Sequence, residues 1–303
     1  MRAVLLGCAL AAACAGAAEP GALRSPIVGG TPTTGDPAVV LLIAQVPGSK
    51  LATLCSASLV APRVLLTAAH CLIPQVVGDG AVFQVLPGPN IDVARQSDLL
   101  PVQGVHAHPD FDQASVAGGN DIGVVVLPSP LGTPPIPMHR DALSNDLVGR
   151  PARLVGYGQT MANDPTGASA GQRREVTTVM GGYTDRLVRF GTAGQSTCEG
   201  DSGGPGLMTF DGEERIVGVV SYGDIDCAQF GVDTRVDRYA DDWVQPFVDD
   251  PDGDGTKKGG GCSVPCTRDV TVPWLLVAIA VALVGNRRPA TGNRRPATSE
   301  DRI

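Results

Sequence analysis

The sequence predicts an all-β domain, either a barrel or a sandwich, in the middle of the chain. Apolar runs between residues 27 and 248 are short and rich in Val and Leu, and Gly, Pro, Asn and Asp interrupt them, which is typical of short strands. The 303 residues include 39 Gly and 25 Pro, so turns are frequent and long helices are disfavoured. Hydrophobic residues make up 43% of the chain, which is enough to bury a sizeable core.

The expected strands follow the apolar runs in order along the chain. We expect them within residues 39–46, 56–69, 81–86, 121–127, 152–158 and 215–223. A single helix is expected over residues 237–248, where Tyr239, Trp243 and Phe247 recur at a spacing of four.

The charge balance excludes some classes of function. The chain has 23 basic and 31 acidic residues and a net charge of -8. An acidic chain is a poor non-specific partner for nucleic acid, because phosphate contacts need Lys and Arg. Charged residues make up only 18% of the chain, which argues against a disordered polyelectrolyte.

Residues 1–18 have the pattern of a secretory signal peptide. Arg2 precedes a short apolar run, small residues follow, and cleavage is expected after Ala17 or Ala18. Residues 19–26 would then form a short propeptide. The alternatives are a buried N-terminal strand, which the run of Ala disfavours, and a lipoprotein signal at Cys14, whose preceding residues match a lipobox weakly. Export would place the mature chain where disulfides persist.

The C-terminal region begins with an acidic and Gly-rich linker, residues 249–271, which contains Cys262 and Cys266. Its acidic cluster resembles half of a calcium-binding loop but lacks the closing Glu, so a solvated linker is the better interpretation. Residues 272–285 are apolar but fall short of the ~20 residues that span a bilayer. They predict either a short membrane anchor or a buried core helix.

An Arg-rich tail, residues 286–303, follows the apolar run and contains part of a tandem GNRRPAT repeat over 285–291 and 292–298. Positive charge behind an apolar run of an exported protein predicts that the C-terminus stays inside the cell. The whole tail resembles the C-terminal surface-sorting signals of myxobacteria. That resemblance implies processing near Cys262 by a sorting protease, which would leave the protein on the cell surface or release it.

Four motifs in the middle of the chain carry the chemistry. TAAHC (67–71) presents His70, and an imidazole is the natural general base near neutral pH. DIGVVVL (121–127) places Asp121 at the head of an apolar strand, where a partly buried carboxylate needs a partner. CEGDSGGP (198–205) flanks Ser202 with glycines that permit close approach of a substrate. IVGG (27–30) follows the expected export cleavage.

Each motif alone has a structural explanation: a buried His, a strand cap or a turn-rich loop. Together and in this order, over roughly residues 27–248, they resemble the chymotrypsin-like serine proteases, the family with the trypsin fold. The resemblance implies two antiparallel six-stranded β-barrels with a C-terminal helix. It implies that Ser202 is the nucleophile, His70 the general base and Asp121 the group that orients the imidazole, as in the catalytic triad of that family. The backbone N–H groups of Gly200 and Ser202 would form the oxyanion hole.

The resemblance also implies two disulfides, Cys55–Cys71 beneath His70 and Cys198–Cys227 between the walls of the substrate pocket. Each is of a kind that stabilises secreted domains by ~3 kcal/mol. It further implies a zymogen, in which a newly freed Ile27 ammonium pairs with Asp201. An activating protease would cut either after Arg24, leaving two extra residues, or after Pro26.

The residues that the resemblance assigns to the substrate pocket carry no charge: Ser196, Thr197, Ser221, Gly223 and Gly231. A neutral pocket with glycine walls should prefer a bulky apolar or aromatic residue before the cleaved bond, the P1 residue. Ser221 and Gly223 would pair with the main chain of a peptide or protein substrate. Asp224 and Asp226 lie in the adjacent loop, where they could attract a basic side chain.

No cofactor or metal is expected. The remaining histidines, His106, His108 and His139, lack the spacing of metal ligands and are interpreted as loop residues.

Two functions remain open. The first is a secreted or surface-anchored serine endopeptidase that acts on peptides or proteins. The second is a non-catalytic binding module with the same fold; such members usually lose one of the three triad residues, all of which are present here. A stored zymogen is a third, weaker alternative.

Overall fold

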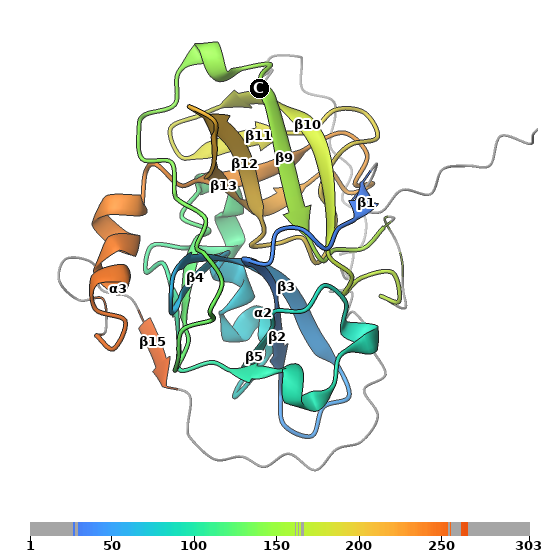
Figure 1. Ribbon diagram of the computed structural model, residues 1–303, viewed down its shortest axis with the longest axis vertical. Helices are drawn as coiled ribbons and strands as arrows, with labels where there is room; N and C mark the ends of the chain where they lie inside the picture. Colours follow the sequence, from blue (N-terminus) through green and yellow to red (C-terminus); the bar gives the residue numbers. More distant parts are fainter. Residues whose placement is uncertain are drawn as a thin grey trace, which may run out of the picture.

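The protein consists of two antiparallel β-sheets, one placed above the other (Figure 1). The computed structural model describes residue 27, residues 30–160, residues 162 and 164, residues 167–253, residue 255 and the backbone of residues 262–265. The all-β prediction with a short C-terminal helix is confirmed.

The first sheet has eight strands in the order β15-β7-β8-β4-β3-β2-β5-β6 and is not closed by hydrogen bonds among the described residues. In chain order its strands are β2 (Val39–Gln45), β3 (Ala52–Ala61), β4 (Val64–Thr67), β5 (Val82–Leu86), β6 (Leu100–Pro101), β7 (Gly104–Ala107), β8 (Gly123–Val126) and β15 (Cys262–Pro265).

The second sheet closes into a barrel of six strands, because β9 pairs with both β10 and β12 at the two ends of the strand order. Its strands are β9 (Pro151–Gly156), β10 (Arg174–Tyr183), β11 (Leu187–Phe190), β12 (Pro205–Phe210), β13 (Glu213–Gly223) and β14 (Gly231–Arg235). The short β1 (Thr31–Pro32) adds to the edge of β10.

Helices are few and short. They are α2 (Pro74–Val77), α3 (Gln245–Asp249), a π-helical turn η6 (Ala240–Val244) that leads into α3, and the 3-10 turns η1 (Ala69–Cys71), η2 (Ile91–Val93), η3 (Gln96–Asp98), η4 (Gln113–Gly118) and η5 (Asn145–Leu147). The helix expected over residues 237–248 therefore begins three residues later and ends one residue later. Trp243 and Phe247 are buried and pack edge to face, as their spacing of four predicts.

Every apolar run that predicted a strand contains one. The run at 56–69 contains two, because Pro62 and Arg63 make the turn between β3 and β4. No apolar run predicted β10, in which the buried Val176, Thr178 and Met180 alternate with more exposed residues. Such alternation is typical of a strand with one solvated face.

Two findings concern the ends of the domain. Within the expected linker, Cys262–Pro265 forms β15 and pairs with β7, whose outer edge would otherwise be unpaired. No helix among the described residues is long and apolar enough to cross a membrane. The expected signal peptide, the propeptide 19–26, the apolar segment 272–285 and the Arg-rich tail lie outside the described residues.

Candidate active site

Strand β3 positions the loop that carries His70. Cys55 on β3 forms a disulfide with Cys71, the residue after His70. The hydroxyl of Thr67 donates a hydrogen bond of 2.8 Å to the carbonyl of Ser56, also on β3. A covalent bond and a buried hydrogen bond therefore fix both sides of η1, the turn that contains His70.

The same strand holds the loop that carries Ser202. The backbone N–H of Ser56 donates to the carbonyl of Ser202 at 2.8 Å, and the Ser56 hydroxyl donates to the carbonyl of Gly200 at 3.0 Å. Sγ of Cys71 lies 3.8 Å from the carbonyl oxygen of Ser202. Two loops from different sheets thus meet on one strand, and the backbone of Ser202 lies against Cys71, the residue after His70. The sequence analysis missed Ser56, which has no motif of its own.

Gly203 permits this contact between the loops. It has φ +82°, and a Cβ atom there would lie 2.1 Å from Oγ1 of Thr67 and 2.3 Å from the carbonyl oxygen of Ser56. Any side chain would therefore push the Ser202 loop away from β3. Glycine is required here for both its backbone conformation and its size.

His70 and Asp121 form a doubly hydrogen-bonded pair. Nδ1 of His70 lies 2.7 Å from Oδ2 of Asp121, and the backbone N–H of His70 donates to Oδ1 at 2.9 Å. Asp121 is fully buried, whereas the His70 side chain keeps 16% of its surface exposed. Because an ionised carboxylate only accepts hydrogen bonds, Nδ1 carries the imidazole proton and Nε2 is left as the basic nitrogen.

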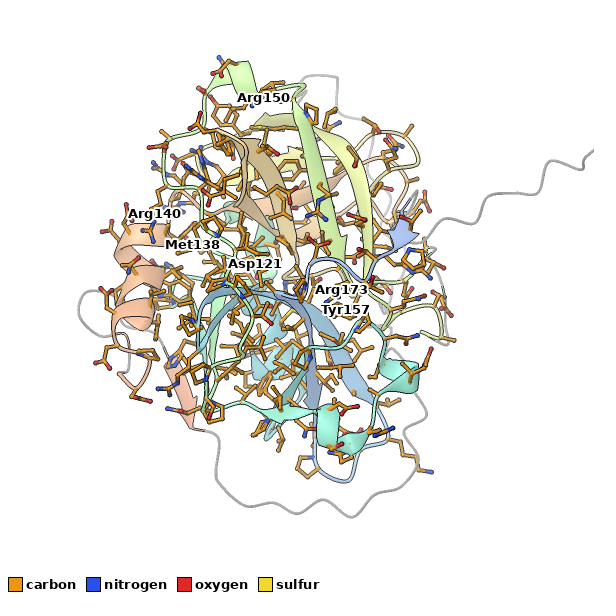
Figure 2. All side chains as sticks on the ribbon, in the orientation of Figure 1. Asp121, Met138, Arg140, Arg150, Tyr157 and Arg173 are labelled. Carbon is orange, nitrogen blue, oxygen red and sulfur yellow. A yellow bond between two sulfur atoms is a disulfide. The ribbon has the colours of Figure 1, made fainter. Side chains whose placement is uncertain are left out.

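The closed barrel of the second sheet, called the second barrel below, fixes the position of Asp121. Ser221 on β13 donates its hydroxyl hydrogen bond to Oδ2 of Asp121, and Thr234 on β14 donates to the carbonyl oxygen of Asp121 at 2.9 Å. Figure 2 shows Asp121 at the junction of the two sheets. Both oxygens of the Asp121 carboxylate therefore accept hydrogen bonds, as its burial requires.

Ser202 itself is half-buried, and among the described residues no hydrogen bond joins its hydroxyl to the His70 ring. Such contacts are often long before a substrate binds. Within the described residues, the backbone N–H groups of Gly200 and Ser202 have no hydrogen-bond acceptor. Gly200 has φ +93° and lies against Gly158, so its peptide is held by a close approach of two glycines.

Asp201 is buried at the base of the Ser202 loop. Its carboxylate accepts hydrogen bonds from the N–H groups of Gly158 at 2.8 Å and Cys198 at 2.9 Å. Burial raises the pKa of Asp201 to about 7, although these two N–H groups and the charge of Arg174 act against it. Ile27 is also fully buried, in the core of the second barrel. Within the described residues no ion pair is formed by Asp201.

The residues assigned to the pocket lie close together at one end of the second barrel. Gly223 and Gly231 are opposite each other on β13 and β14. A Cβ atom at Gly231 would lie 2.2 Å from Oγ1 of Thr197, so this side chain packs directly on the glycine. Ser196 and Thr197 are both buried. The predicted Cys198–Cys227 disulfide is present and joins the Ser202 loop to the loop between β13 and β14.

Two acidic residues near the pocket have surroundings that the sequence analysis did not predict. Asp224 has a structural role at the rim, because its carboxylate accepts hydrogen bonds from the N–H groups of Ala228, Gln229 and Phe230. Partial burial acts to raise the pKa of Asp224, but these N–H groups lower it overall. Asp233 on β14 is fully buried, and the sequence analysis did not identify it.

The other histidines pack against aromatic rings. His106 lies on β7, not in a loop as expected, and its ring is 4.5 Å from that of Phe247. His139 stacks on Phe210 at 4.1 Å. His108 packs against Tyr239 and Trp243. Among the described residues, the one cluster of potential metal ligands is Cys55, His70 and Cys71, whose two sulfurs are bonded to each other.

Comparison with known proteins agrees with this geometry. The family model described as Trypsin matches residues 27–244. The trypsin of Saccharopolyspora erythraea is 29% identical over 203 residues, which cover 62% of this chain and 84% of that protein. The CLIP domain-containing serine protease B4 of Anopheles gambiae is 25% identical, covering 75% and 71% respectively. Human kallikrein-11 is 27% identical, covering 65% and 72%.

Proposed function

Because this chain belongs to the trypsin family, we propose that it is a serine endopeptidase that hydrolyses peptide bonds through an acyl-enzyme. The relatives reported above are named as a serine protease, a trypsin and a kallikrein, which supports a protein or peptide as substrate. The observation that carries the proposal is the His70–Asp121 pair at 2.7 Å, on a loop tethered to the same strand as the Ser202 loop.

The proposed reaction uses each group in turn. Nε2 of His70 takes the proton of the Ser202 hydroxyl as Oγ attacks the carbonyl carbon of the substrate. The protonated imidazole then gives this proton to the leaving amine, and an acyl group remains on Ser202. Water repeats the sequence and releases the acid. Asp121 keeps Nδ1 protonated throughout and stabilises the positive charge that forms on the ring.

The oxyanion of the tetrahedral intermediate would be bound by the N–H groups of Gly200 and Ser202. Their lack of an acceptor in the described structure supports this role. The Ser56 hydroxyl holds the carbonyl of Gly200 and so orients the loop that presents these donors. One such donor contributes about 3 kcal/mol to the lowering of the barrier.

We propose that activation frees the amine of Ile27, whose ammonium pairs with Asp201. Two observations support it. Both residues are buried. Burial raises the pKa of Asp201 to about 7, and within the described residues its carboxylate forms no ion pair that would offset this. An ammonium would stabilise the ionised carboxylate and the adjacent oxyanion loop. The protease is therefore proposed to be exported as a zymogen and to act outside the cell or at its surface.

The proposed P1 residue is bulky and apolar or aromatic. Ser196 and Thr197 contribute no charge, and the carboxylate of Asp224 is occupied by backbone donors. Burial, with a further contribution from the charge of Asp201, raises the pKa of Asp233 well above its ordinary value and so disfavours a negative charge on this acid. An uncharged pocket offers a cationic side chain no partner to replace its lost hydration.

Reaction with a fluorophosphonate probe tests the proposal. Protein with a free Ile27 amine should be labelled at Ser202, and the Ser202→Ala and His70→Ala variants should not. The matched control is Ser58→Ala, a buried serine on β3 whose hydroxyl has no hydrogen-bond partner in the described structure. A matured wild-type protein that remains unlabelled would favour the non-catalytic binding module instead.

A further inference from the structure

Asp233 is a buried acid that the proposed mechanism does not use. Its side chain is fully buried on β14, and neither carboxyl oxygen has a hydrogen-bond partner in the described part of the chain. A buried polar group without a partner destabilises a fold, and such groups are uncommon. Because this unpaired carboxyl group is close to a candidate active site, we infer that a bound substrate supplies its hydrogen-bond partner.

The strand register places Asp233 next to the nucleophile loop. Asp233 is opposite Val220 on β13. The carbonyl of Val220 accepts from the N–H of Gly203 at 2.8 Å, and its N–H donates to the carbonyl of Gly204 at 2.9 Å. Gly203 and Gly204 directly follow Ser202. One strand therefore separates Asp233 from the loop that carries the nucleophile.

Asp233 also shares a face of β14 with the wall of the pocket. Residues two apart on a strand point to the same side, so Asp233 follows Gly231 on the face that contacts Thr197. The rise of a strand puts it about 7 Å farther from the strand end. The carboxyl group thus lies deeper in the second barrel than the glycine that opens the pocket.

The surroundings of the carboxyl group are bare and apolar. A Cβ atom at Gly206 or at Gly218 would lie 2.7 Å from Oδ2 of Asp233, and the side chains beside these two glycines are Phe190 and Val188. The charged group that acts on it is Asp201, which disfavours a second negative charge. Burial is the larger cause of its raised pKa. A protonated carboxyl group is both a donor and an acceptor, as a hydroxyl is.

We propose that Asp233 is a specificity-determining residue, whose carboxyl group exchanges hydrogen bonds with the phenolic hydroxyl of a P1 tyrosine and so selects Tyr over Phe. The inference rests on the proposed endopeptidase function and narrows its substrate class. A cation would need an ionised carboxylate at Asp233, which burial and the neighbouring Asp201 disfavour, whereas a phenolic hydroxyl can both donate to and accept from the unpaired carboxyl group. A P1 phenylalanine leaves the buried acid without a partner.

Two peptide p-nitroanilides that differ only in P1, Tyr or Phe, test this with the matured enzyme. We expect kcat/KM to be about ten-fold higher for the Tyr peptide. In Asp233→Val this ratio should fall to about one through loss on the Tyr peptide alone. Asp233→Asn should keep part of the preference, because an amide also donates and accepts. Asp226→Asn, at an exposed carboxylate of the neighbouring loop, is the matched control and should leave the ratio unchanged.

Valine fits the site by size and replaces an unpaired polar group, so Asp233→Val is expected to fold and to react with the fluorophosphonate probe. If it does not, the Asn variant and competition of the probe by p-cresol against toluene in wild type still decide the question. A Tyr-to-Phe ratio near one in wild type, or an unchanged ratio in Asp233→Val, would overturn the proposal. So would a preference of the wild type for an Arg peptide that Asp233→Asn abolishes. Failure of wild-type Ser202 to react would instead refute the endopeptidase function.

Discussion

Replacing Asp121 by asparagine should abolish most of the activity while keeping the fold. The two oxygens of Asp121 accept hydrogen bonds from the N–H of His70, from Nδ1 of His70 and from the Ser221 hydroxyl. Asparagine has only one accepting oxygen. If that oxygen keeps the backbone N–H of His70, the amide NH2 group faces Nδ1, which must then be unprotonated. The imidazole proton moves to Nε2, and the ring can no longer take the proton of Ser202.

The expected magnitude follows from this tautomer. In the catalytic triad of this family, the same change lowers kcat about ten-thousand-fold, which corresponds to about 5 kcal/mol of barrier at 1.36 kcal/mol per factor of ten. Ser221→Ala is the control, because it removes one donor to the same carboxylate and leaves both contacts with His70. A single hydrogen bond is worth about 1 kcal/mol, so its loss should lower the rate by a factor of ten or less.

The assay is the rate of fluorophosphonate labelling, together with kcat/KM on a peptide p-nitroanilide, for matured wild type and both variants. Near-ultraviolet circular dichroism checks that the fold is retained. Labelling of Asp121→Asn within ten-fold of wild type would refute the role of Asp121 in orienting His70. Equal losses in Asp121→Asn and Ser221→Ala would show that the carboxylate acts only through its contact with β13.

Three further predictions concern stability. Removing the Cys55–Cys71 disulfide, whose partners are 16 residues apart, should lower the free energy of unfolding by roughly 3 kcal/mol in urea titrations; an unchanged midpoint would contradict it. Arg153 makes ion pairs with three carboxylates at 2.6–2.7 Å, so Arg153→Leu should cost about 3 kcal/mol and lower Tm, whereas Arg238→Leu, at a more exposed pair, should cost under 1 kcal/mol. Because burial raises the pKa of Asp201 to about 7 in the uncleaved chain, its contribution to stability is complete below about pH 4 and is lost as pH rises through 7. Between pH 5 and 8 a Ser202→Ala precursor should therefore lose roughly 3 kcal/mol more than the same precursor with Asp201→Asn, and equal pH dependence of the two would exclude this cause.

Local motifs in the sequence predicted the candidate catalytic residues, whereas the contacts that position them are seen only in the structure. Three sequence motifs indicated His70, Asp121 and Ser202 as candidate catalytic residues. The short apolar runs predicted strands that carry or flank these residues. These signals are local, because strand alternation and turn residues are written into neighbouring positions. The expectation of two six-stranded barrels and two disulfides came from resemblance to a family. The structure contains both disulfides and one closed six-stranded barrel, while the first sheet has eight strands and is open among the described residues.

The sequence could not identify the residues that act through long-range contacts. Ser56 ties the nucleophile loop to β3, yet it is an ordinary serine in an apolar run and its partner Gly200 is 144 positions away. β15 was expected to be linker, because nothing near residues 262–265 shows that β7 offers them a free edge. His106 was interpreted as a loop residue but lies on β7.

Residue identities alone determined which groups can transfer a proton, attack a carbonyl or form a disulfide. The closed second barrel and its contact with β3 decided that an imidazole and a carboxylate 51 positions apart lie 2.7 Å from each other. They also decided that Asp233 is sealed away from water while Asp224 is held by three backbone N–H groups. The pKa of Asp233 is raised and that of Asp224 is lowered, because tertiary packing buries the first carboxyl group without donors and surrounds the second with backbone N–H groups.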